Sequence, residues 1–213
     1  MSRERILRTA IDLADRDGIE AVSMRRIAHE LGVVPMALYK HVANKEEILD
    51  GLVELVIGEI DPVSSDDDWK TAVRTRILSA RRALLRHPWA ARVIETRTEP
   101  GPAMLAYMDS MIGLFLAAGF SIDLTHHALH ALGNRLLGYT QELFDDSEDV
   151  EPDAEAARWA ELADTYPHIH RITLSVTHDD ASVVGGRGCD DQLEFEFALD
   201  LMLDGLERIK AGT

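Results

Sequence analysis

The sequence predicts an all-α protein in which an N-terminal three-helix domain is followed by a larger helical domain. Apolar residues recur at helical spacing along most of the chain, and we find no convincing strand. Residues that cap helices stand at the starts of these periodic stretches, and glycines stand at several of their ends. The charge balance also changes after the first quarter, which marks that quarter as a separate unit.

The first quarter carries clear start and stop signals for short helices. Gly18 and Gly32 can end helices, and Ser23 is a good N-cap. Asn44 and Glu47 have the spacing of a capping box. The expected helices cover about 3–17, 24–31, 35–41 and 45–60. The tight turn between the second and third makes a helix-turn-helix.

A loop at Pro62 and the acidic run after it mark the boundary between two domains. We expect a domain at 1–48, a second at 61–213, and the helix at 45–60 joining them. Expected helices in the second domain cover about 69–86, 88–97, 103–118, 122–144 and 190–210, with short ones near 154–164 and 168–176. The glycine-rich stretch 185–188 lacks the spacing of a phosphate-binding loop.

Cysteine content and hydropathy limit the compartment and the chemistry. Cys189 is the only cysteine, which excludes an intramolecular disulfide and a cysteine-cluster metal site. A lone thiol is typical of a reducing cytoplasm. No signal peptide and no apolar run of membrane-spanning length is found, so we expect a cytoplasmic protein without membrane contact.

The net charge of −16 is unevenly distributed. Residues 1–48 hold eight basic and eight acidic residues, whereas the rest of the chain holds 14 basic and 30 acidic ones. Because DNA repels acidic surfaces, the neutral first quarter is the part that could approach it.

The third helix of the helix-turn-helix would project its first residues into a major groove. Met36 and Ala37 suit a thymine methyl group, whereas Tyr39, His41 and Lys45 suit phosphate oxygens. The candidate DNA-binding residues are Ser23, Arg25, Arg26, Met36, Ala37, Tyr39, Lys40, His41 and Lys45. The alternative is a plain three-helix packing unit with a solvated basic edge.

The stretch from Ile11 to Leu52 resembles the N-terminal domain of the tetracycline-repressor family of bacterial transcription regulators. The matching elements include Gly18, Leu31-Gly32-Val33, Ala37-Leu38-Tyr39, His41-Val42 and Asn44-Lys45. Residues 69–144 resemble the branch that contains the tetracycline repressors, through Trp69, Ala83–His87, Gly119-Phe120-Ser121 and Ala131–Gly138. The resemblance implies a homodimer that binds a double-stranded DNA operator and is released by a small-molecule inducer.

The resemblance does not extend to the tetracycline–magnesium pocket of that branch. Its histidines, asparagine, phenylalanine and glutamine fall here near Asp61, Arg76, Ala80, Ile94 or Glu95, and Met111. Only a glutamate is matched, by Glu142. The residues that open the third helix, Pro35, Met36 and Ala37, also depart from the polar set of that branch, so we expect a different operator.

The helices at 122–144 and 190–210 are candidates for a dimer interface. The first carries a narrow seam with alternating spacings of three and four, and the second has two apolar stripes. The candidate interface residues are Leu129, Leu132, Leu136, Leu143, Met202 and Leu206. A fully buried core helix in a monomer is the alternative.

A methionine stripe on the helix at 103–118 could line a ligand pocket, because methionine adapts to irregular shapes. The candidate ligand residues are Met104, Tyr107, Met108, Met111, Asn134, Arg135 and Glu142. Ordinary core packing is the alternative. His126 and His130, four residues apart, could share a metal, but such pairs are more often packed or interfacial, so we expect no metal and no cofactor.

Two functions follow from these patterns. The first is a ligand-responsive transcriptional regulator, most simply a repressor. The second is a helical small-molecule-binding protein or enzyme with a vestigial helix-turn-helix. No nucleophile elbow and no acid–base constellation is found, so we expect no catalytic residues and no enzyme activity.

Overall fold

The computed structural model describes residues 1–63, 67–138, 163–168, 170–171 and 191–212. The chain divides into two compact units, one of residues 1–140 with 202–213 and one of residues 141–201. We describe mainly the first, since most of the second lies outside the described residues. The same holds for Glu142, Leu143, Cys189, the loop at 185–188 and most of the helices expected near 154–164 and 168–176.

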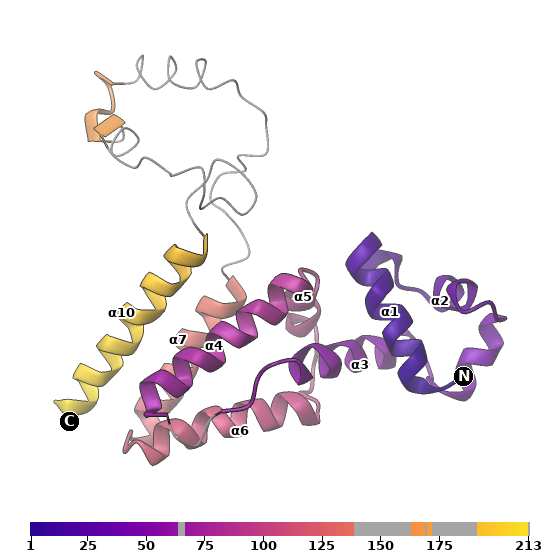
Figure 1. Ribbon diagram of the computed structural model, residues 1–213, viewed down its shortest axis with the longest axis horizontal. Helices are drawn as coiled ribbons and strands as arrows, with labels where there is room; N and C mark the ends of the chain where they lie inside the picture. Colours follow the sequence, from indigo (N-terminus) through magenta and orange to yellow (C-terminus); the bar gives the residue numbers. More distant parts are fainter. Residues whose placement is uncertain (64–66, 139–162, 169, 172–190, 213) are drawn as a thin grey trace. The chain divides into compact units, whose positions relative to one another are not determined.

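The N-terminal helices form a helix-turn-helix at the end of the first unit (Figure 1). They are α1 (Arg3–Asp17), η1 (Ile19–Ala21), α2 (Met24–Glu30), η2 (Pro35–Lys40) and α3 (Lys45–Gly58). The two expected caps are confirmed, because Ser23 Oγ accepts a hydrogen bond from the Arg26 amide at 3.2 Å and Asn44 Oδ1 accepts one from the Glu47 amide at 2.9 Å. The expected third helix is a short 3₁₀ helix, η2, anchored by the fully buried Leu38.

The remaining described helices begin and end close to the expected residues. They are α4 (Trp69–Arg86), α5 (Ala90–Glu95), α6 (Pro102–Ala117), α7 (Ile122–Gly138) and α10 (Asp191–Ala211). Every regular element in the described part of the chain is helical, which confirms the all-α prediction. No described helix has the length and apolar character needed to cross a membrane.

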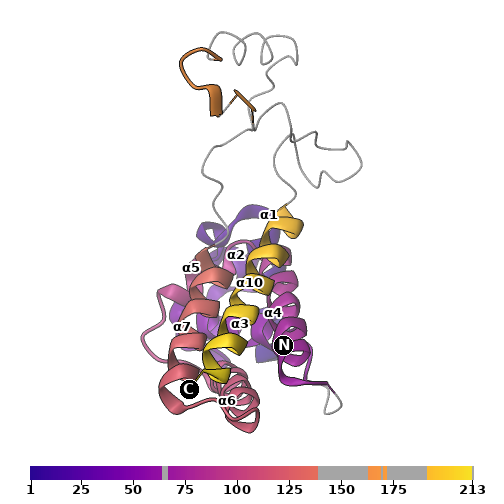
Figure 2. The same cartoon turned by 90° about the vertical axis from the view of Figure 1, so that its left-hand side faces the viewer.

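Helix α3 connects the two ends of the first unit (Figure 1), and the view along its long axis shows α6 below α4 and α7 (Figure 2). It packs on α1 at the helix-turn-helix end and on α4, α5 and α6 at the other. One cluster of buried apolar residues runs from Ile6 on α1 through Leu52 on α3 to Leu84 on α4 and Val93 on α5. Motion of α3 is therefore shared by both ends.

Leu7 of α1 packs against Gly51 of α3. A Cβ atom at this position would lie 2.6 Å from a methyl carbon of Leu7, which is only 3% exposed. A larger residue at Gly51 would therefore force the buried Leu7 side chain to shift.

Candidate functional site

The exposed surface of the helix-turn-helix is unusually apolar around η2. Val34 is 67% exposed, Met36 72% and Tyr39 50%. Exposed apolar side chains at the start of a reading helix suit contacts with base methyl groups and sugars. Ala37 and His41 are half-buried beside them. Of the predicted apolar contacts, Met36 is thus the most accessible.

The predicted phosphate-contacting residues differ in whether their side chains already form ion pairs or hydrogen bonds within the protein. Arg26 forms ion pairs with Asp17 at 3.0 Å and Glu30 at 3.7 Å, and Ser23 is used as a cap. Arg25 and Lys40 are exposed, and Lys45 is half-buried at the start of α3. Arg25, Lys40 and Lys45 are therefore better placed than Arg26 to reach phosphates.

A cavity of about 300 Å³ lies between α3, α4, α6 and α7. Its volume is at the lower end of the range, about 300–1,000 Å³, of small-molecule pockets. The lining residues are Val56, Ile57, Ile60, Ile77, Ala80, Leu84, Ile94, Met104, Tyr107, Met108, Met111, Leu129, Leu132, Gly133, Leu136 and Leu137. Because Val56 and Ile57 belong to α3, the helix that contacts the reading domain is itself a wall of the cavity.

The four predicted ligand residues on α6, Met104, Tyr107, Met108 and Met111, all line this cavity. The predicted polar anchors on α7 do not: Asn134 is exposed and Arg135 half-buried, and neither is among the lining residues. Among the predicted ligand residues that the structure describes, those on α6 therefore share one cavity and those on α7 lie outside its lining.

Three predicted interface leucines of α7, Leu129, Leu132 and Leu136, line the cavity of their own chain. Leu132 is only 1% exposed, whereas Leu129 and Leu136 are half-buried. On α10, Leu206 is 9% exposed and Met202 is half-buried. A seam with spacings of three and four looks the same in sequence whether it contacts its own core or a partner, so these residues stay a predicted interface.

The second apolar stripe of α10 consists of Leu193, Phe197 and Leu201, and it is exposed. Leu193 is 63% exposed, Phe197 61% and Leu201 53%. On α7, Ile122 is 78% exposed, and His126, His127 and His130 are exposed beside one another. Within the described residues no cluster of histidine, cysteine and carboxylate side chains is suited to hold a metal ion.

Tyr107 carries the polar group of the cavity wall. Its hydroxyl is buried and has no hydrogen-bond partner among the described residues. Burial raises the pKa of Tyr107 to about 12, against a smaller lowering effect of Arg76. The Arg76 guanidinium lies 4.9 Å from the centre of the Tyr107 ring, and its Nη1 donates to the Asp61 carbonyl at 2.8 Å.

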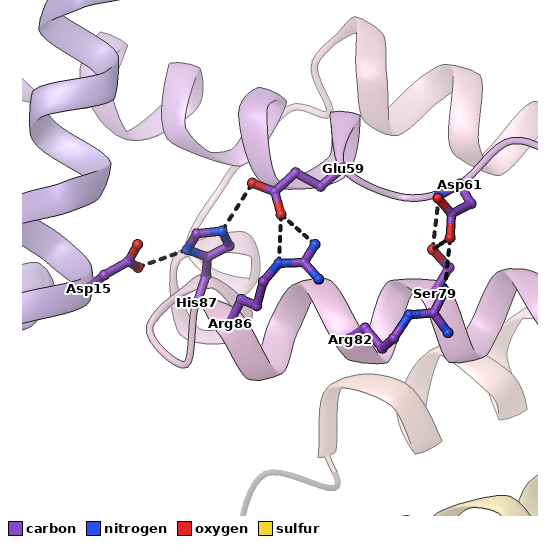
Figure 3. Close-up of polar contacts among 7 residues, drawn as sticks. All are labelled: Asp15, Glu59, Asp61, Ser79, Arg82, Arg86 and His87. Carbon is purple, nitrogen blue, oxygen red and sulfur yellow. Dashed lines mark hydrogen bonds and ion pairs between the residues drawn. The ribbon is translucent and has the colours of Figure 1, made fainter.

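Asp61 falls near the position where the resembling tetracycline repressors have a tetracycline-binding histidine. Here its side chain bonds to residues of α4. Its carboxylate accepts hydrogen bonds at 2.8 Å from Ser79 Oγ and from the Arg82 guanidinium (Figure 3). These bonds hold the pKa of Asp61 below its ordinary value.

A charged junction ties α1 to the second domain (Figure 3). His87 lies between two carboxylates, with Nδ1 2.8 Å from Asp15 Oδ1 and Nε2 3.2 Å from Glu59 Oε1. The Trp89 indole N–H also donates to Asp15 at 2.7 Å, and Arg86 donates to Glu59. We call these five residues the junction. Sequence reasoning missed it because Asp15 and His87 are 72 residues apart.

Both ring nitrogens of His87 lie within hydrogen-bond distance of a carboxylate oxygen, and a carboxylate only accepts hydrogen bonds. Burial acts to raise the pKa of Glu59, but hydrogen bonds from Arg86 and His87 outweigh it and lower that pKa below its ordinary value. The junction is therefore a network of charge-assisted hydrogen bonds.

A second contact joins α3 to the cavity helix α6. Glu54 Oε2 accepts a hydrogen bond from the Ala103 amide at 2.9 Å. Ala103 lies in the first turn of α6, where amides lack partners within the helix. A side chain of α3 thus caps the helix that contributes Met104, Tyr107 and Met111 to the cavity.

Together these features define a helix-turn-helix protein with a second, cavity-containing helical domain. The description "Bacterial regulatory proteins, tetR family" matches residues 6–52, and "Tetracyclin repressor-like, C-terminal domain" matches residues 61–209. The chain belongs to the tetR family of bacterial transcriptional regulators.

Two curated relatives illustrate the range of similarity. The Tetracycline repressor protein class C of Escherichia coli is 31% identical, over 100% of this chain and 94% of that protein. An HTH-type transcriptional regulator of Saccharopolyspora erythraea is 35% identical over 65% of this chain, and the match spans only 59% of that protein.

Solved structures show the same fold. The Streptomyces coelicolor TetR family protein ActR in complex with (S)-DNPA has a TM-score of 0.75 at 25% identity, covering 100% of this chain and 98% of that chain. ActR in complex with actinorhodin has a TM-score of 0.76 at 25% identity, covering 97% and 95%.

Proposed function

We propose that this protein binds a palindromic DNA operator as a homodimer and releases it when a small, mainly apolar molecule enters the cavity. One observation carries the proposal: α3 both packs against the reading domain and supplies Val56 and Ile57 to the cavity wall. The complexes of ActR with (S)-DNPA and actinorhodin support it, since a related fold accepts organic molecules.

Operator recognition would use the exposed surface around η2. Met36 and Ala37 would meet base edges, and Arg25, Lys40 and Lys45 would meet phosphates, with Tyr39 between the two groups. Two recognition helices must lie about 34–36 Å apart, or a multiple of that distance, to read successive major grooves.

Coupling would pass through α3. A ligand that fills the cavity displaces the end of α3 next to Glu59, and the junction transmits this displacement to Asp15 on α1. A ligand shifts the equilibrium only by its difference in affinity for the two states, typically about 1–3 kcal/mol, which corresponds to a roughly 5–150-fold loss of operator affinity.

The dimer would use α7 and α10, with the exposed stripe of α10 added to the predicted interface residues. Leu201→Glu should then yield monomers at micromolar concentration in sedimentation velocity, because it places a charge in an apolar interface. Leu85→Glu is the matched control, since Leu85 on α4 is similarly exposed at 56%. A wild-type monomer, or dimers of both variants, would contradict this interface.

The operator is tested by selecting duplexes from a randomised pool with the full chain. Binding of the selected duplex should fall steeply with salt, and Lys45→Ala should weaken it and flatten the salt dependence. Arg92→Ala is the control, because it removes one positive charge from an exposed site on α5. Failure to enrich any duplex contradicts the proposal.

A further inference from the structure

The turn into η2 carries a run of apolar side chains that point to solvent. Val34 is 67% exposed and Met36 72%, Pro35 between them is also exposed, and Ala37 is half-buried. We call residues 34–37 the apolar run. It is held in place from below, because Leu38 of η2 is fully buried in the core. An exposed apolar surface on a fixed backbone is typical of a contact with a partner.

The surroundings of the apolar run match the major groove of DNA. Lys40 ends η2 and is exposed, and Arg25 is exposed on α2, which packs against η2. A major groove presents base edges between two rows of phosphates. An apolar centre with cations on its own helix and on the neighbouring one is therefore complementary to that groove.

The apolar run cannot read the hydrogen-bonding pattern of a base pair. No side chain from residue 34 to residue 38 carries an N–H, an O–H or a carbonyl group. In the major groove thymine presents an oxygen and a methyl group, whereas cytosine presents an amino group and no methyl. Of these features, an apolar side chain gains contact area only from the methyl group, which lies on carbon C5 of the pyrimidine ring.

We infer that the apolar run selects pyrimidines by the methyl group on C5. Thymine and 5-methylcytosine are then bound alike, and uracil and unmethylated cytosine are bound alike but more weakly. The inference rests on the proposed function, since it specifies which feature of the operator is read. It also makes operator binding responsive to DNA methylation, because methylation of a cytosine at such a position creates a base that the run recognises.

Four duplexes that differ at one symmetric pair of positions test this inference by fluorescence anisotropy with the full chain. In the duplex selected from the randomised pool, each thymine is first replaced by uracil. The thymine with the largest effect is then also replaced by cytosine and by 5-methylcytosine, each opposite guanine. Burial of one methyl group changes affinity by about fourfold, so uracil in both half-sites should weaken binding by roughly 15-fold. The 5-methylcytosine duplex should bind as the thymine duplex does, and the cytosine duplex as the uracil duplex does.

Shortening the apolar run should remove this discrimination. The double variant Val34→Ala, Met36→Ala should lose most of the difference between methylated and unmethylated duplexes, because alanine is too short to bury the C5 methyl groups. Both side chains are exposed, so the variant should fold as the wild type does, which thermal unfolding verifies. Lys40→Ala is the contrasting variant. It should weaken all four duplexes by the same factor, because a phosphate contact does not depend on the base.

Three results would overturn the inference while operator binding stands. Uracil may replace every thymine of the selected duplex without loss of affinity, the affinities may follow the base pair and not the methyl group, or the double variant may keep the full difference. Failure to select any duplex is a separate result. It contradicts operator binding and this inference together, and it is expected if the apolar run contacts another protein.

Discussion

The junction and the cavity lie at the same end of α3, yet they are built from opposite chemistry. In the junction, His87 and Arg86 contact two carboxylates in directional hydrogen bonds between α1 and the second domain. In the cavity, apolar side chains surround an open space, and the buried Tyr107 hydroxyl has no partner among the described residues. The polar groups of the first region are paired, whereas the second region leaves space.

The largest expected effect is loss of the junction. His87→Leu removes the ring that contacts both Asp15 and Glu59 and should lower the free energy of unfolding by about 2–4 kcal/mol in urea titrations. His87→Gln retains one donor and should cost about half as much. His127→Gln, at an exposed position on α7, is the control. Equal stability of His87→Leu and the wild type would show that the junction does not fix α1.

The ionisation of Tyr107 in the cavity wall should make the free energy of unfolding depend on alkaline pH. The pKa of Tyr107 is raised to about 12, so between pH 10 and 12 the tyrosine ionises in the unfolded chain but stays neutral in the folded one. Its contribution is fully present below pH 10 and is lost as pH rises through 12, by about 2–3 kcal/mol.

Absorbance at 295 nm measures this ionisation. The wild-type titration should contain a late component that is missing from Tyr107→Phe, whereas Tyr166→Phe should retain it. A Tyr107→Phe curve that lacks only a component near pH 10 would contradict burial of the hydroxyl.

A smaller effect is expected where α1 crosses α3, away from both regions. Gly51→Ala should lower stability by about 1 kcal/mol, because crowding against the buried Leu7 exceeds the gain in helix propensity. Gly58→Ala is the control in the same helix, since no atom lies within 4 Å of its added Cβ. A higher thermal unfolding temperature for Gly51→Ala than for Gly58→Ala would show that Leu7 moves aside at little cost.

The smallest expected effect is the loss of stability when Glu59 of the junction is protonated at acid pH. Hydrogen bonds lower the pKa of Glu59 in the folded state, so its contribution is present above the ordinary glutamate pKa and is lost as pH falls through the lowered value. Comparison of wild type with Glu59→Gln between pH 5 and 3 should show a steeper loss for the wild type. Parallel curves would indicate that Glu59 is not stabilised.

Local signals predicted the helices well because caps and turns act over a few residues. Ser23 and Asn44 stand where the structure uses them, as N-caps of α2 and α3. The methionine stripe on α6 lies along the cavity, since its spacing puts those side chains on one face.

Predictions from sequence were weaker where a contact depends on distant parts of the chain. Periodicity located the leucine seam of α7 but could not tell whether its partner was the chain's own cavity or another chain. The ion pairs of Arg26 with Asp17 and Glu30 and the contact of His87 with Asp15 arise only from the folded arrangement.

The Glu54 cap on α6 has a consequence for how the cavity wall can change in evolution. The residues of α6 that line the cavity, from Met104 to Met111, follow directly after the capped Ala103 amide and are separate from the junction and from η2. Exchanging them for side chains of similar volume would change the chemistry of the cavity while the capped end of α6, the junction and η2 keep their contacts. A few substitutions on one helix can then alter what fits the cavity without altering the helix-turn-helix.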